Sequence, residues 1–119
     1  MKKKILIVDD VPDDLVSMRT ILERAGYAVS TATSGASALK ALRTGPPHLI
    51  LIDIEMPALS GYDLLRILRE KLNHKVKMLF VTIVPSHDVE PSDIDDIIHK
   101  PFSPQTLVAR VTKALSGKP

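Results

Sequence analysis

The sequence predicts an α/β fold: a doubly wound, five-stranded parallel sheet with helices on both faces. Two observations indicate this class. Short apolar runs alternate with amphipathic segments of helical period, an order typical of strand–helix–strand units. The runs are continuously apolar, which indicates strands covered on both faces. The 119 residues suffice for one domain, and we expect a single domain over residues 1–119, whether it stands alone or was cut from a longer protein.

The first half of the chain supplies three expected strands, over residues 5–8, 27–32 and 49–52. A helix is expected over residues 11–25, where apolar side chains recur at helical spacing, Pro12 suits the first turn and Gly26 stops the last. Ser34 is a candidate N-cap for a shorter helix that ends near Gly45.

The second half repeats this alternation less regularly. Residues 78–81 and 97–98 are the expected fourth and fifth strands, a helix follows Gly61, and Ser103 caps a last helix. Residues 85–96 are polar and include Pro91, so we expect the fourth helix to be short, irregular or mobile. Right-handed crossovers leave few topologies, and the flavodoxin-like strand order 2-1-3-4-5 fits best.

Composition excludes several classes of function. Without cysteine the chain has no disulfide, thiolate metal site or cysteine nucleophile. No apolar run reaches the roughly 18 residues of a membrane span and no signal-peptide core is present, so we expect a cytoplasmic protein without membrane contacts. With 16 basic and 14 acidic residues, two Tyr and two Phe, direct binding of nucleic acid is not expected.

Polar side chains follow the apolar strands. Asp9 and Asp10 end the first strand, Asp53 the third, Thr82 the fourth and Lys100 the last. In a doubly wound sheet, ligands bind beyond these carboxyl ends. Three carboxylates meeting there repel one another unless a cation binds or a pKa rises, and Mg²⁺ suits oxygen ligands. Because Thr82 and Lys100 can bind anionic oxygens, the set predicts a phosphoryl-transfer site with Asp53 as the nucleophile.

Residues 5–10, 22–29, 53–61, 81–82 and 100–102 together carry a family resemblance. Over nearly its whole length, the chain resembles a response-regulator receiver domain of two-component signalling. The resemblance implies a phosphoacceptor that supports its own phosphotransfer and autodephosphorylation, rather than an enzyme. Its partners would be a histidine kinase or phosphotransfer protein and a downstream protein or fused effector domain.

The resemblance also implies roles for individual residues. Asp53 would receive the phosphoryl group, and Thr82 and Lys100 would hold the phosphoryl oxygens. Mg²⁺ would be bound by the carboxylates of Asp10 and Asp53, by Asp9, often through water, and by the backbone carbonyl of Glu55. The Lys100–Pro101 bond would be cis, which is energetically accessible before proline.

Two positions and one spacing depart from the family pattern. Ile97 stands where similar domains carry Tyr or Phe, so the usual coupling of the threonine to an aromatic ring is in doubt. Ile83 follows Thr82 where Ala or Gly is usual, and it could narrow access to Asp53. Only 17 residues separate Thr82 from Lys100, about one helical turn fewer than usual. We therefore expect phosphorylation to be read out through the loop after Thr82.

Other classes of function stay open. A pseudo-receiver, which binds proteins without phosphorylation, is favoured by Ile83 and Ile97 and opposed by the complete acidic site. A magnesium-dependent phosphohydrolase would also form an aspartyl phosphate, but its acidic motif belongs on the first strand, whereas Asp53 lies on the third. A flavin or dinucleotide domain needs a phosphate-binding loop where Asp9 and Asp10 lie.

The net charge of +2 conceals a separation of charge along the chain. Residues 88–96 contain five acids and no Lys or Arg, and a basic stripe precedes them, formed by Arg66, Arg69, Lys71, Lys75 and Lys77. Partner binding at this region is therefore expected to weaken with salt. Whether the chain forms a homodimer stays an open question, because the surface on which similar domains dimerise includes the segment that departs from the family pattern.

Overall fold

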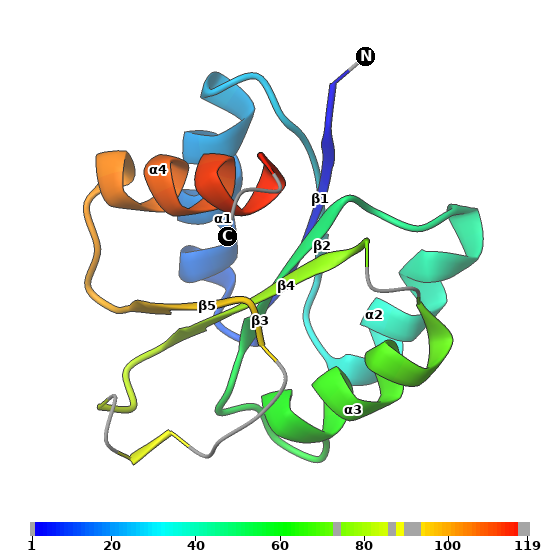
Figure 1. Cartoon of the computed structure of the whole chain (residues 1–119). Helices are drawn as coiled ribbons and strands as arrows, with labels where there is room; N and C mark the ends of the chain where they lie inside the picture. Colours follow the sequence, from blue (N-terminus) through cyan, green and yellow to red (C-terminus); the bar gives the residue numbers. More distant parts are fainter. Residues whose placement is uncertain (1, 73–74, 86–87, 90–93, 117–119) are drawn as a thin grey trace.

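In the computed structural model, which describes residues 2–72, 75–85, 88–89 and 94–116, five parallel strands form one sheet (Figure 1). Their order is β2-β1-β3-β4-β5, so the fold class and strand order expected from the sequence are confirmed. The strands are β1 (Lys4–Val8), β2 (Ala28–Ala32), β3 (Leu49–Asp53), β4 (Lys77–Thr82) and β5 (Asp96–His99).

Helices cover both faces of the sheet (Figure 1). One face carries α1 and α4, whose apolar side chains share a layer with Ile5, Leu49 and Leu79. The other face carries α2 and α3, which pack over Leu6 and Ile50. The helices are α1 (Pro12–Arg24), α2 (Gly35–Ala41), α3 (Gly61–Lys71) and α4 (Pro104–Leu115), with a 3₁₀ turn, Leu42–Thr44, after α2.

The two apolar layers explain why apolar and polar residues do not alternate along the inner strands. Successive β1 residues point to opposite layers, Ile5 and Ile7 to one and Leu6 and Val8 to the other, and all four are buried. All five residues of β3, the central strand, are buried as well. A sheet apolar on both faces needs helices on both faces, as the sequence predicted.

Side-chain caps fix where the helices begin. Ser34 accepts a hydrogen bond from the backbone N–H of Ser37 at the start of α2, and Ser103 does the same for α4. Pro12 occupies the first turn of α1, and Gly26, at φ 99°, follows its last turn. Ser60 caps α3, a role that the sequence analysis had not assigned.

The segment between β4 and β5 bears on the expected fourth helix. The described residues 83–85, 88–89 and 94–95 form no α-helix, so α4 of this chain is the helix after β5. The segment expected to hold the fourth helix also includes residues 86–87 and 90–93, which lie outside the described residues. No helix in the described part of the chain is long and apolar enough to span a membrane.

Candidate functional site

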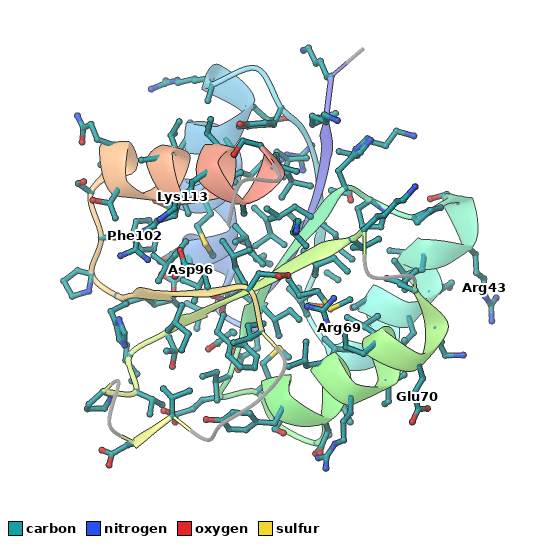
Figure 2. The ribbon with its side chains drawn as sticks, in the orientation of Figure 1. Arg43, Arg69, Glu70, Asp96, Phe102 and Lys113 are labelled. Atoms are coloured by element: carbon teal, nitrogen blue, oxygen red, sulfur yellow. The ribbon has the colours of Figure 1, made fainter. Side chains whose placement is uncertain are left out.

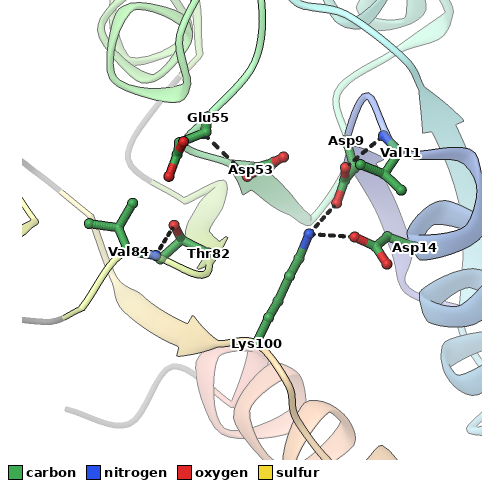
Figure 3. A network of polar contacts seen from close by, with 8 residues as sticks. All are labelled: Asp9, Val11, Asp14, Asp53, Glu55, Thr82, Val84 and Lys100. Atoms are coloured by element: carbon green, nitrogen blue, oxygen red, sulfur yellow. Dashed lines mark hydrogen bonds and ion pairs between the residues drawn. The ribbon is translucent and has the colours of Figure 1, made fainter.

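The carboxyl ends of β1, β3, β4 and β5 bring the expected polar residues to one edge of the sheet (Figure 3). Asp9 follows β1 and is fully buried, and its Oδ1 accepts the backbone N–H of Val11 at 2.9 Å. Asp53 and Thr82 are the last residues of β3 and β4, and both are buried. The Asp53 carboxylate and the Thr82 hydroxyl are therefore fixed by strands, and Asp9 lies directly after one.

Asp9, Asp10 and Asp53 form a candidate cation site. Each offers a carboxylate oxygen, and these oxygens all lie within 4.8 Å of one another. Asp9 and Asp53 are buried and Asp10 is partly buried, so the cluster has little water to screen its charge. Buried carboxylates at this spacing fit a hard divalent cation with oxygen ligands, which is the chemistry expected for Mg²⁺.

The electrostatics of the cluster act on Asp53. Burial, followed by the negative charge of Asp9, raises the pKa of Asp53 from its ordinary value of 3.8 to about 7. Lys100, and the backbone N–H of Glu55, which donates to Asp53 Oδ1 over 3.2 Å, act in the opposite direction without cancelling it. The Glu55 carbonyl stays a prediction as a metal ligand.

Lys100 directly follows the edge strand β5, and its side chain reaches the cluster from there. Its Nζ donates to Asp9 Oδ2 at 2.9 Å and to Asp14 Oδ2 at 2.7 Å (Figure 3). The Lys100–Pro101 peptide bond is cis, as the family resemblance had implied. Burial lowers the pKa of Lys100, but the hydrogen bonds to Asp14 and Asp9 outweigh burial and raise it, so the ammonium is held in its charged form.

Asp14 is the site residue that the sequence analysis missed as a partner of Lys100. It lies in the first turn of α1, where an acidic residue is sufficiently explained by the helix dipole. The ion pair joins residues 86 positions apart, so no local pattern reveals it. The available signal was the short connection between β1 and α1. It places the first turn of α1 beside the carboxyl end of the sheet, where Lys100 is expected.

Thr82 is connected to the loop that follows it. Its Oγ1 accepts the backbone N–H of Val84 at 3.0 Å, and its own hydroxyl hydrogen remains available as a donor (Figure 3). Ile83 lies between them with 69% of its surface exposed. Unlike Ile83, Ile97 packs against the apolar layer beneath α3. It therefore fills core space at the position where the family pattern has an aromatic ring.

Gly61 places α3 against the end of β3. A Cβ added there would lie 2.5 Å from the backbone oxygen of Asp53 and 2.7 Å from the Cα of Ile54. The Gly61 N–H also donates to the Ile54 carbonyl at 2.8 Å. The backbone beside the Asp53 carboxylate is therefore fixed by a close approach that only glycine permits.

Ion pairs with distant arginines partly neutralise the acidic segment 88–96 that the sequence shows. Arg69 extends from α3 (Figure 2). Its guanidinium binds Asp95 at 3.0 Å. Arg110 of α4 donates to both carboxylate oxygens of Asp96 at 2.9 Å. Asp95 and Asp96 thus have basic partners from distant helices, and Asp95 also accepts the Met78 N–H at 2.8 Å.

Comparison with known proteins gives one family. The family model described as "Response regulator receiver domain" matches residues 5–112. The PhoP alkaline phosphatase synthesis regulator of Bacillus subtilis is 37% identical over 97% of this chain and 49% of its own length. KdpE of Mycobacterium tuberculosis is 36% identical over 93% of this chain and 50% of its own length. The chain thus spans about half the length of these curated relatives.

Solved structures resemble nearly the whole chain. A receiver domain from Methanospirillum hungatei is 31% identical with a TM-score of 0.86, covering 98% of this chain and 95% of its own. The response regulator TrrA of Thermotoga maritima, solved in complex with Mg²⁺–BeF, is 32% identical with a TM-score of 0.85, covering 94% and 98%. The comparisons of sequence and of fold therefore indicate the same family.

Proposed function

Because the chain belongs to the family of response-regulator receiver domains, we propose that Asp53 accepts the phosphoryl group in a two-component pathway. The observation that carries this proposal is the meeting of three carboxylates within 4.8 Å with the Lys100 ammonium at one edge of the sheet. Asp53 is the member that ends the central strand, where the family resemblance places the phosphoacceptor.

The proposed step exchanges one bond for another. A carboxylate oxygen of Asp53 attacks the phosphorus of a phosphohistidine, the P–N bond breaks, and the imidazole leaves and takes up a proton. Thr82 would donate its hydroxyl hydrogen to a phosphoryl oxygen while it keeps the hydrogen bond from Val84. Lys100 would neutralise a second oxygen. Water later attacks the acyl phosphate and releases inorganic phosphate, which restores Asp53.

Mg²⁺ is the proposed cofactor, held by Asp9, Asp10, Asp53 and the Glu55 carbonyl. When bound, it supplies positive charge against both the carboxylates and the incoming phosphoryl oxygens. The rise of the Asp53 pKa to about 7 supports this assignment, because burial and then the negative charge of Asp9 disfavour the ionised carboxylate, and a bound cation would favour it. The Mg²⁺–BeF complex of TrrA, a structural relative, is consistent with the same chemistry.

The proposed partners follow from this chemistry. A histidine kinase or phosphotransfer protein would supply the phosphoryl group, in the cytoplasm. A downstream protein or an effector domain would receive the signal, since the curated relatives are transcriptional regulators about twice as long as this chain. We propose that the hydrogen bond from Val84 to Thr82 passes the change to the exposed loop at Ile83.

Intact-mass measurement with a small-molecule phosphodonor tests the proposal. Wild type should gain one phosphoryl group in the presence of Mg²⁺ and none with a chelator. Asp53→Asn should gain none, whereas Asp13→Asn, which removes an exposed charge from the first turn of α1, should react like wild type. No adduct on wild type, or an equal adduct on Asp53→Asn, would refute it.

A magnesium titration separates this function from that of a pseudo-receiver. Ile97, which lacks a ring, is the observation that favours the pseudo-receiver. A phosphoacceptor site should bind Mg²⁺ and lose it in Asp10→Ala. If Mg²⁺ leaves the amide spectrum of the wild type unchanged, the domain acts as a binding module without phosphorylation.

A further inference from the structure

Asp14 adds a fourth carboxylate to the site, and its contact is with Lys100 alone among the expected site residues in the described part of the chain. The distance from Lys100 Nζ is 2.7 Å to Asp14 Oδ2 and 2.9 Å to Asp9 Oδ2. The structure thus places the ammonium between the end of β1 and the first turn of α1.

The two carboxylates hold the ammonium under different conditions. The Asp9 side chain is fully buried, so its charge depends on Lys100 for compensation. The Asp14 side chain is 40% exposed, so water can replace Lys100 there at small cost. The Asp9 contact is therefore structural, and the Asp14 contact is the one that can be released.

We propose that Asp14 is a positioning residue that holds the Lys100 ammonium at α1 and competes for it with an anion bound at Asp53. This inference rests on the proposed function, because the anion is the phosphoryl group or its analogue. Any phosphoryl oxygen that binds Lys100 must draw the ammonium from Asp14 or share it with that carboxylate. Asp14 thereby weakens retention of the phosphoryl group.

Beryllofluoride with Mg²⁺ is the probe, and Asp14→Asn is the test variant. The substitution keeps the shape of the side chain and removes the charge that binds Lys100. Asp13→Asn is the matched control, because it removes the same charge from the same helical turn, beside the same helix dipole. Asp14→Asn should bind beryllofluoride about two- to fivefold more tightly than Asp13→Asn, the range of a partly exposed ion pair.

The lifetime of the aspartyl phosphate supplies a second readout. It should lengthen in Asp14→Asn by a similar factor and stay at the wild-type value in Asp13→Asn. Equal affinities and lifetimes in the two variants, or weaker binding by Asp14→Asn, would overturn the inference. Weaker binding would mean that Asp14 aims Lys100 at the anion instead of withholding it.

A readout without any anion keeps this inference separate from the proposed function. The side-chain resonances of Lys100 should show greater mobility in Asp14→Asn than in wild type or Asp13→Asn, since one of two anchors is lost. If wild type binds no beryllofluoride, the proposed function fails, and the mobility of Lys100 still decides whether Asp14 positions it. Unchanged mobility in Asp14→Asn would refute the positioning role.

Discussion

The ammonium of Lys100 lies 2.9 Å from Oδ2 of Asp9, although β5 and β1 are separated in the sheet by β3 and β4. The contact spans 91 positions of the sequence and compensates a fully buried carboxylate. Removing one partner of such a pair leaves a buried charge without compensation, which is more costly than never burying the pair.

Lys100→Met should therefore lower the free energy of unfolding by about 3 kcal/mol at neutral pH. Most of that loss should disappear in the double variant Asp9→Asn/Lys100→Met, because Asn leaves no charge to compensate. Urea denaturation of the four proteins of this cycle measures the coupling. Additive single losses would show that the ion pair does not stabilise the fold.

Asp53 should make stability depend on pH. Its pKa is about 7 in the folded chain against an ordinary 3.8, so between these values the folded state binds more protons than the unfolded state. Stability should fall as pH rises from about 4 to about 7, and the full loss should be present above pH 7. At low pH the carboxyl is protonated in both states and has no such effect.

Asp53→Asn should consequently stabilise the protein at pH 8 by on the order of 2 kcal/mol, with the gain shrinking as pH is lowered toward 4. The Asn side chain can still accept the Glu55 N–H, so the loop is preserved. Chemical denaturation across this pH range, with Asp13→Asn as control, measures the effect. A gain that is independent of pH would contradict the account.

The close approach at Gly61 predicts a contrast between two glycines. In Gly61→Ala the new Cβ would meet backbone atoms of Asp53 and Ile54, which cannot move without displacing β3. In Gly35→Ala it would meet the side chain of Leu59, which can rotate. Gly61→Ala should cost about 2 kcal/mol or more, and Gly35→Ala less. Thermal denaturation of both variants checks the order, and equal losses would be contrary evidence.

Two arginines of α3 provide another contrast. Arg69 is 13% exposed and donates to Asp95 and to the Val76 carbonyl, whereas Arg66 is 75% exposed and pairs with Asp63 within the helix. Arg69→Met should cost about 1–2 kcal/mol, because it removes the donor from the partly buried Val76 carbonyl and from the Asp95 carboxylate. Arg66→Met should cost under about 0.5 kcal/mol. Urea titrations compare them, and a larger loss at Arg66 would contradict the assignment.

Most of the fold could be predicted because its signals are local. Continuous apolar runs mark strands buried on both faces, and Ser34, Ser103 and Pro104 mark helix starts by the hydrogen bonds and dihedral angles that helices need. Ser60 was overlooked although it has the same chemistry. The handedness of crossovers left few possible strand orders, and the best-fitting one is observed; this is a general constraint rather than a property of particular residues.

The site was predictable to the extent that strand ends define it. The carboxyl ends of neighbouring strands carry the site residues Asp9, Asp53, Thr82 and Lys100. Their convergence therefore followed from the topology of the sheet. The partner of the lysine did not, because the contact with Asp14 depends on where a long side chain turns after it leaves β5. Charge counting over residues 88–96 likewise could not reveal the distant arginines that neutralise two of the acids.

The chemical location of the phosphoryl group is the most direct test of the account. Wild type is treated with a small-molecule phosphodonor and Mg²⁺, the acyl phosphate is reduced with borohydride, and the peptides are sequenced by mass spectrometry. The account predicts that the reduced residue is Asp53. Reduction at Asp9, Asp10, Asp14 or Glu55, or at no residue in a protein that remains folded, would contradict it.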